Sequence, residues 1–271
     1  MIIAIKMAIN ILSFGGGVNT VALLLYCINN NSNNGNNSNN NSNDLELDSV
    51  IFADTGGEFP DTYAYINKYI MPLCKAHNIP FITVKKEPSL YDYCYERKIL
   101  PSRRLRWCTD KWKIKPIHKA IYERAKLNNT KSVNMLLGIA YDEIERINDN
   151  RIRKYNKTLQ INVCYPLVDL KWKRADCINY ITKCGYPIPV KSGCYFCPFT
   201  NSKGWIKLKN NYPTLFEKAL ALENNCARKD FTLTYSKKGL SEVLAQTSID
   251  TFLFDNDVEE ENNDCGGFCF I

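Results

Sequence analysis

The stretch SFGGGVNT, residues 13–20, decides the fold. It follows an apolar run at residues 8–14 that predicts a buried strand, and residues 18–28 continue it as a short apolar helix. Glycines in such a loop let the backbone approach a phosphate closely, and the start of a helix offers free N–H groups and the positive end of its dipole. The loop therefore predicts a phosphate-binding turn. The alternative is a tight strand-to-helix turn that binds nothing.

Strand and helix patterns alternate after this loop. Alternation of this kind predicts an α/β fold, with a Rossmann-like, doubly wound parallel sheet. The expected strands are residues 48–53, 81–84 and 133–139, and the expected helices are residues 60–77 and 111–127.

Two divisions of the chain follow from composition. Residues 29–44 hold almost only Asn and Ser and cannot bury a core, so we expect a disordered insertion in a surface loop. The pattern changes near residue 161, and we divide the chain into a nucleotide-binding α/β domain, residues 1–160, and a C-terminal part, residues 161–271. That part is expected to be α-rich and to contain cysteines. Its expected helices are residues 173–183 and 213–224.

Composition and charge indicate the partners, the compartment and the use of the cysteines. The net charge of +7 indicates anionic partners such as nucleotides or nucleic acid, or else simply a basic solvated surface. The sequence shows no run long and apolar enough for a membrane span and no signal-peptide pattern, so we expect a cytoplasmic protein. In that compartment, 12 cysteines favour metal binding or redox use over a disulfide framework.

The glycine loop resembles the PP-loop of ATP pyrophosphatases, whose pattern is S-x-G-G-x-D-S. Asn19 stands where that pattern has Asp, which weakens a direct magnesium contact, and Val18 replaces a frequent Lys. No Walker lysine is present, which excludes a kinase-type P-loop. The resemblance implies a bound adenine nucleotide, with magnesium as a further candidate. The implied contacts are Ser13, Gly15, Gly16, Gly17, Asn19 and Thr20.

Further segments resemble the phosphoadenosine phosphosulfate (PAPS) reductase family of the PP-loop, or adenine nucleotide alpha hydrolase, superfamily. DTGGEFPDT, residues 54–62, resembles its D-T-G-x-x-F-P-E-T segment, which places Asp54 at the nucleotide crevice. The alternative for Asp54 is a turn or helix-capping residue. RRLRWCTDKWKIKPI, residues 103–117, resembles C-C-x-x-x-K-x-x-P-[IL] and is the most basic stretch of the chain.

A third resemblance lies in LLGIAYDEIERI, residues 136–147, which matches the family's G-I-x-x-D-E-x-x-R. It implies nucleotide contacts for Gly138, Asp142 and Glu143. It also makes Arg146 a catalytic anion clamp, which a carboxylate would orient. The alternative is an ion pair on a helix surface, because the spacing of three and four residues suits one equally well.

The cysteines suggest a metal centre. Cys194 and Cys197 form a C-x-x-C motif followed by proline, and such turns recur at iron–sulfur and zinc sites. The layout resembles the cluster-bearing reductases of adenosine phosphosulfate (APS), which adds Cys108 as a ligand. The tail offers Cys265 and Cys269: either Cys265 is the catalytic nucleophile and Cys269 the fourth ligand, or a tail cysteine closes a four-cysteine site. An iron–sulfur cluster and zinc both remain open.

The sequence thus predicts an enzyme that binds ATP or PAPS/APS and performs sulfur chemistry. The first hypothesis is ATP-dependent sulfur transfer from a sulfur donor, with nucleic acid among the possible acceptors. The second is reduction of PAPS or APS to sulfite by a thiol reductant. A hypothesis of another class is a zinc-stapled, nucleic-acid-binding protein on an inactive enzyme fold.

Overall fold

A five-stranded parallel sheet forms the centre of the computed structural model, which describes residues 8–33, 45–148, 159–234 and 238–243. The strand order is β3-β2-β1-β4-β5, so the chain reverses its direction across the sheet at β1. In such sheets ligands bind at the carboxyl ends of the strands beside the reversal. The strands are β1 Ile9–Phe14, β2 Ser49–Asp54, β3 Phe81–Lys85, β4 Ser132–Leu137 and β5 Gln160–Cys164.

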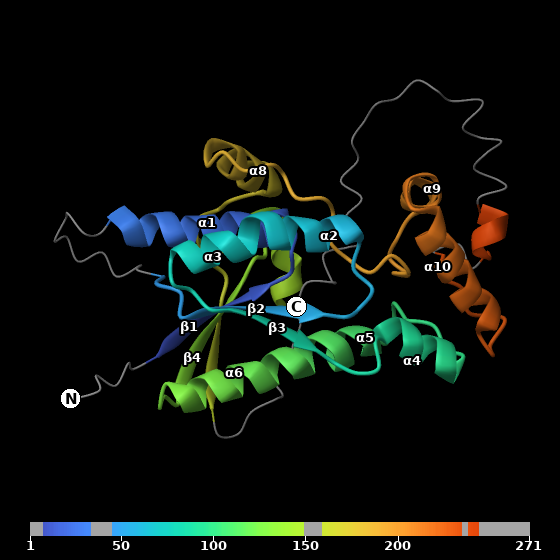
Figure 1. Cartoon of the computed structure of the whole chain (residues 1–271), viewed down its shortest axis with the longest axis horizontal. Coiled ribbons are helices and arrows are strands. Elements are labelled where there is room, and N and C mark those ends of the chain that lie inside the picture. Colours follow the sequence, from blue (N-terminus) through green and yellow to red (C-terminus); the bar gives the residue numbers. More distant parts are fainter. Residues whose placement is uncertain (1–7, 34–44, 149–158, 235–237, 244–271) are drawn as a thin grey trace.

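Helices cover both faces of the sheet, as Figure 1 shows. On one face lie α1 (Val18–Asn33), α3 (Met71–Ala76) and α8 (Arg174–Lys183), and on the other lies α6 (Lys115–Leu127). The prediction of a Rossmann-like, doubly wound parallel sheet is therefore confirmed.

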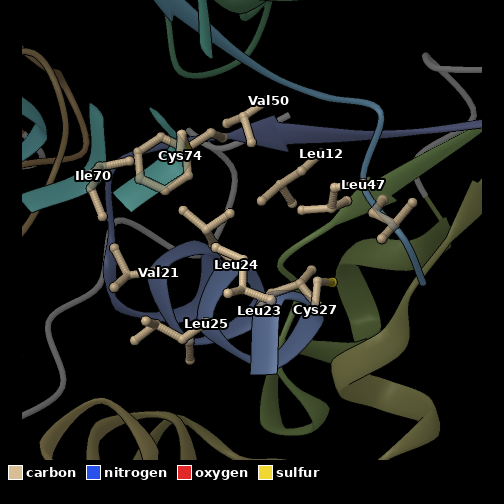
Figure 2. Close-up of a cluster of buried hydrophobic side chains, with 14 of the residues drawn as sticks. Leu12, Val21, Leu23, Leu24, Leu25, Cys27, Leu47, Val50, Ile70 and Cys74 are labelled. Atoms are coloured by element: carbon tan, nitrogen blue, oxygen red, sulfur yellow. The ribbon is translucent and has the colours of Figure 1, made fainter. Parts of the chain in front are cut away.

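The apolar core follows from the alternation of side chains along each strand. In β1, Leu12 packs into the cluster around α1, whereas Ile9 and Ile11 pack into the cluster around α6. Figure 2 shows the first cluster, in which Val21 and Leu24 of α1 lie between the sheet and α3. Because α1 is anchored so completely, the glycine loop at its start is held rigidly.

Two long helices contain π-helical segments that the sequence analysis did not predict. The helix over residues 60–77 runs through α2 (Pro60–Tyr65), η1 (Ile66–Ile70) and α3. The Met71 N–H bonds to the Ile66 carbonyl, five residues back, and Pro72 follows. Proline lacks the N–H that an α-helical bond would need, so the turn before it widens.

The same arrangement recurs before Pro116. The segments are α5 (Trp107–Thr109) and η2 (Asp110–Ile114), with α6 following. The expected helix at residues 111–127 therefore begins earlier, at Trp107.

The expectation for residues 29–44 is wrong in part. α1 continues through Asn33, because Asn29 and the residues after it keep the helical hydrogen bonding. The Asn29 side-chain amide donates to the Tyr180 hydroxyl at 3.1 Å, which anchors this end of α1 on α8. Residues 34–44 lie outside the described residues.

The strand β5 was not predicted. It extends the sheet across the division that the sequence analysis expected at residue 160.

The C-terminal part adds a third apolar cluster beside the sheet. Its largest buried side chains include Trp112, Phe196, Trp205 and Phe216. Within the described ranges, no helix is long and apolar enough to cross a membrane. The remaining helices are α4 Leu90–Arg97, η3 Tyr141–Asn148, α7 Pro166–Asp169, α9 Ser202–Asn211 and α10 Pro213–Asn225.

Candidate functional site

A small cavity opens against the glycine loop at the carboxyl ends of β1 and β4. We call it the loop cavity. It is lined by the loop (Gly17 to Thr20), Gly138, Glu143, Arg174 and the pair Lys191 and Ser192. Ser13 is buried at the end of β1 next to the loop, where it pairs with Ile51 and Leu137. Gly15 follows half-buried.

The backbone of the loop requires glycine at its turn. Gly16 has φ +76°, a left-handed conformation that residues with a Cβ rarely adopt, and its Cβ would lie 3.0 Å from Thr62 Cγ2. A Cβ on Gly138, at the end of β4, would lie 2.7 Å from Thr20 Cγ2 and 3.0 Å from the Thr20 backbone. The end of β4 therefore approaches the start of α1 this closely only because Gly138 lacks a side chain, and α2 packs against the loop at Gly16.

The Glu143 carboxylate joins the loop to the predicted anion clamp. Its Oε2 accepts a hydrogen bond from Asn19 Nδ2 at 2.9 Å and one from Arg146 Nη1 at 2.8 Å. Arg146 is 5% exposed, so this is a largely desolvated ion pair. Asn19 Oδ1 is buried and has no hydrogen-bond partner within the described chain, which leaves one neutral oxygen beside the cavity.

Arg174 and Lys191 give the loop cavity its positive charge, and the sequence analysis did not select them. Asp142 places Arg174, because both of its carboxylate oxygens accept the Arg174 backbone N–H at 3.2 Å. Asp142 itself caps α8 and does not line the cavity. The available signal for Lys191 was its position directly before Ser192 in KSGC, the segment that leads into the C-x-x-C motif.

Asp54 lies in a dense network at the end of β2. Its carboxylate accepts hydrogen bonds from the Gly56 N–H at 2.8 Å and from the Tyr63 hydroxyl, and it pairs with Lys85 at 2.9 Å. Burial raises the pKa of Asp54, but the bonds from Tyr63 and Lys85 outweigh it, so the pKa lies below its ordinary value. The structure thus gives Asp54 a turn-forming role, and its contact with a nucleotide stays a prediction.

Three of the predicted metal ligands meet at a second cavity. Cys108, Cys194 and Cys197 line a space of about 30 Å³, which we call the cysteine cavity. The Cys197 N–H bonds to the Cys194 carbonyl at 3.0 Å, which forms the tight turn of the motif. Glu58 pairs with Cys194 as an antiparallel bridge, so the segment between β2 and α2 holds this turn in place.

The three thiols of the cysteine cavity are half-buried, and charged side chains lie near them. Burial raises the pKa of Cys194 well above its ordinary value. Burial also raises the pKa of Cys108, while Lys113 and Arg106 act in the opposite direction. Lys113 in turn pairs with Glu58 at 3.2 Å. Lys113 and Arg106 thus oppose the effect of burial at Cys108, whereas Glu58 adds to it at Cys194, and the pKa values of both thiols stay above the ordinary value.

The thiols suit a thiophilic metal by their chemistry. In the described ranges, however, no group of three His, Cys, Asp or Glu side chains lies close enough to hold an ion. Cys265 and Cys269, the predicted nucleophile and fourth ligand, lie outside those ranges. The described cysteines therefore form an incomplete donor set around one cavity.

Comparisons with known proteins show several similarities. A family model described as the phosphoadenosine phosphosulfate reductase domain matches residues 9–190. Two uncharacterized proteins of Methanocaldococcus jannaschii, MJ0973 and MJ0066, are 27% and 28% identical over 65% and 62% of this chain. The matches span only 41% and 34% of those two proteins, so this chain corresponds to less than half of each.

Among solved structures, the phosphoadenylyl-sulfate reductase from Candida auris, in a phosphate complex, is similar with a TM-score of 0.41 and 16% identity. That match covers 69% of this chain and 77% of the other. The U34-tRNA thiolase NcsA from Methanococcus maripaludis, with its [4Fe-4S] cluster, gives a TM-score of 0.37 and 15% identity. It covers 82% of this chain and 72% of the thiolase.

Proposed function

This chain belongs to the phosphoadenosine phosphosulfate reductase domain family, and we propose that it is an enzyme that uses ATP to transfer sulfur to an acceptor. Family membership associates the chain with nucleotide binding and sulfur chemistry. The specific reaction is our proposal. The observation that carries it is the Asn19–Glu143–Arg146 network: Asn19 and Glu143 line the loop cavity, and Glu143 pairs with the buried Arg146 guanidinium behind them.

The loop cavity has a volume of about 20 Å³, and the charge of its lining residues suits a phosphate group of ATP. Arg174 and Lys191 supply positive charge, and the first turn of α1 supplies backbone N–H groups. Arg146 is the anion clamp in this proposal, and Glu143 fixes its position. The buried Asn19 Oδ1 is the oxygen we assign to a magnesium ion that accompanies ATP, because a carbonyl oxygen is a ligand that magnesium accepts.

The proposed reaction has two balanced steps. An acceptor carbonyl oxygen attacks the α-phosphorus of ATP, so a P–O bond forms, the bond to the β-phosphate oxygen breaks and pyrophosphate leaves. A hydrosulfide sulfur then attacks the activated carbon, AMP leaves with the former carbonyl oxygen, and the hydrosulfide proton is released to solvent. The products are a C=S group, AMP and pyrophosphate, and no atom changes its oxidation state. The cations of the loop cavity stabilise the negative charge of the leaving pyrophosphate.

The cysteine cavity is the proposed source of the sulfur. Cys108, Cys194 and Cys197 would hold the metal centre, and either Cys269 or Cys265 would complete it. When bound, an iron–sulfur centre supplies a place that holds sulfide for transfer. In the alternative arrangement the Cys265 thiolate is the nucleophile: it attacks the activated carbon and displaces AMP, and hydrosulfide then displaces the Cys265 sulfur to leave the C=S group.

The test is calorimetric titration of the full chain, purified without oxygen, with ATP and separately with PAPS. We expect ATP to bind and Arg174→Gln to weaken it about tenfold, because a charged hydrogen bond is lost. Lys183→Gln, at the other end of α8, is the matched control and should bind normally.

The competing functions give different results. Tight binding of PAPS, with sulfite produced in the presence of a thiol, would replace our proposal by the reductase reaction that the family's name describes. Absence of affinity for either nucleotide would favour the zinc-stapled binding protein.

A further inference from the structure

A cavity of about 370 Å³ lies between the loop cavity and the cysteine cavity. It shares Lys191 and Ser192 with the first and Cys194 and Cys197 with the second. A molecule bound here would therefore contact the walls of both cavities at once. The volume falls within the range of about 300–1,000 Å³ that is usual for small-molecule sites.

One wall of this cavity is aromatic. Phe59 and Tyr212 lie with ring centroids 5.6 Å apart and an interplanar angle of 56°. The Tyr212 hydroxyl donates to the Asp61 carboxylate, which fixes the orientation of the ring. That hydrogen bond is the main reason that the pKa of Tyr212 is raised to about 12, so the hydroxyl stays protonated. Rigid aromatic faces of this kind stack on flat heterocycles.

Residues of α9 and its N-cap also line the cavity, and several of them are polar. Among the lining residues are Asn201 and Asn211, which carry side-chain amides, and Lys207, which carries an ammonium group. Asn201 Oδ1 accepts the Gly204 N–H at 2.8 Å, which leaves its NH₂ group to face a ligand. Amides carry a donor and an acceptor side by side, as the edge of a nucleobase does, and a lysine suits a phosphate.

Ser192 lies where this cavity meets the loop cavity. It is 2% exposed, and its Oγ has no hydrogen-bond partner within the described chain. A Cβ on Gly17 would lie 3.0 Å from this oxygen, so the hydroxyl sits directly against the glycine loop. A buried hydroxyl without a partner carries an energetic cost that a bound ligand would remove.

We propose that this cavity is the acceptor site, and that it binds one nucleotide unit whose base carries a ring carbonyl oxygen. The base stacks against Phe59 and Tyr212, the phosphate lies at Lys207, and Ser192 donates to the ligand at the junction. The inference rests on the proposed function, because activation by ATP requires an acceptor oxygen close to the glycine loop. The subsequent attack requires the adjoining carbon to face the cysteines.

The test uses uridine 5′-monophosphate as the probe, because uracil carries ring carbonyl oxygens. The full chain, purified without oxygen, is first saturated with a non-hydrolysable ATP analogue so that the loop cavity is filled. Calorimetry then measures binding of the probe to the wild type and to variants. We expect Lys207→Gln to weaken binding about tenfold through the lost charge. Lys209→Gln, on the same helix but outside the cavity wall, should leave it unchanged.

A second variant and a truncated probe make the test sharper. Phe59→Leu keeps an apolar side chain and should weaken uridine 5′-monophosphate, while ribose 5-phosphate, which has no base, should bind poorly to every variant. Equal binding of the two probes, or equal effects of Lys207→Gln and Lys209→Gln, would overturn the acceptor site. So would the failure of the probe to bind a chain that still binds the ATP analogue. Failure of the ATP analogue itself would instead overturn the proposed function.

Discussion

At the scale of single residues, Glu143 is the side chain that connects the glycine loop to Arg146. Its carboxylate holds both the Asn19 amide and the buried Arg146 guanidinium, so the loop and the clamp share one anchor. A sequence pattern of three- and four-residue spacing predicts the ion pair equally well on an ordinary helix surface. Asn19 is 124 residues away from Glu143 in sequence, so their contact could be identified only from the folded structure.

Replacing this carboxylate tests its role directly. Glu143→Gln removes the charge that compensates Arg146, and we expect a loss of about 2 kcal/mol in the free energy of unfolding together with clearly weaker ATP binding. Denaturant titration and calorimetry measure the two effects. Glu145→Gln, an exposed neighbour in the same helix, should change neither. Identical behaviour of the two variants would show that the network is incidental.

His118 should make stability depend on pH. Burial in α6 lowers its pKa below the ordinary value of 6.5, so the unfolded chain binds this proton more readily than the folded chain. The free energy of unfolding therefore falls as the pH drops through about 6.5, by at most about 1.4 kcal/mol per pH unit.

The control for this prediction is the other histidine, because the chain has 2. Denaturant titrations at about pH 7.5 and about pH 5.5 should show that His118→Leu has lost part of the difference in stability. His77→Leu, at an exposed position, should retain the wild-type difference. A pH dependence that His118→Leu leaves intact would contradict the assignment.

At the scale of elements, α1 decides how much of the Asn-rich stretch matters. Replacing residues 34–44 by a short Gly-Ser linker should leave the melting temperature nearly unchanged, because loop closure depends only weakly on length. Replacing residues 29–44 should lower it, because the end of α1 and the bond from Asn29 to Tyr180 are lost. Thermal melts of the two variants check this, and equal melting temperatures would show that the last turn of α1 contributes nothing.

Periodicity and glycine placement were enough to predict most of these elements. The strands with continuous apolar runs, such as β1 and β2, were predicted within a residue or two. β5 was missed because its alternation is short and mixed with polar residues, so only its pairing with β4 defines it. The end of α1 was missed because asparagine has a low helix propensity, which the packing on α8 overrides.

At the scale of the whole molecule, the proposed metal centre would join distant parts of the chain, because Cys108 and the C-x-x-C turn line one cavity. Cys194→Ser and Cys197→Ser should lose the metal and lower the melting temperature, because a bound metal contributes to folding. Cys108→Ser should behave alike. Iron, sulfide and zinc analysis of protein purified without oxygen measures the loss. Cys177→Ser, a core position in α8, is the matched control and should keep the metal.

The tail cysteines separate the two forms of the centre. If Cys265 is the nucleophile, Cys265→Ser should keep the metal and lose turnover, while Cys269→Ser should lose the metal. Opposite results would exchange the two roles. Metal content that survives substitution of Cys108, Cys194, Cys197, Cys265 and Cys269 in turn would refute a cysteine-bound centre.

The candidate site was only partly predictable from the sequence, because some of its residues come together only in the folded chain. Motifs selected the glycine loop and the C-x-x-C turn, because their local spacing carries the chemistry. Arg174 and Ser192 belong to no motif of that kind, and they reach the site only because α8 and the segment before the C-x-x-C turn pass the end of the sheet. Such residues become visible only once the chain is folded.

The central position of β1 in the sheet also affects the order in which this protein can fold during its synthesis. Asn10 in β1 bonds to Asp48, 38 residues later, and to Asn134, 124 residues later. During synthesis on the ribosome, β1 and the apolar side chains of α1 therefore emerge long before β4 is available to pair with β1. Contacts of such long range slow folding. Since Gly138 packs on Thr20 at the wall of the loop cavity, we expect this cavity to form only after β4 has joined the sheet.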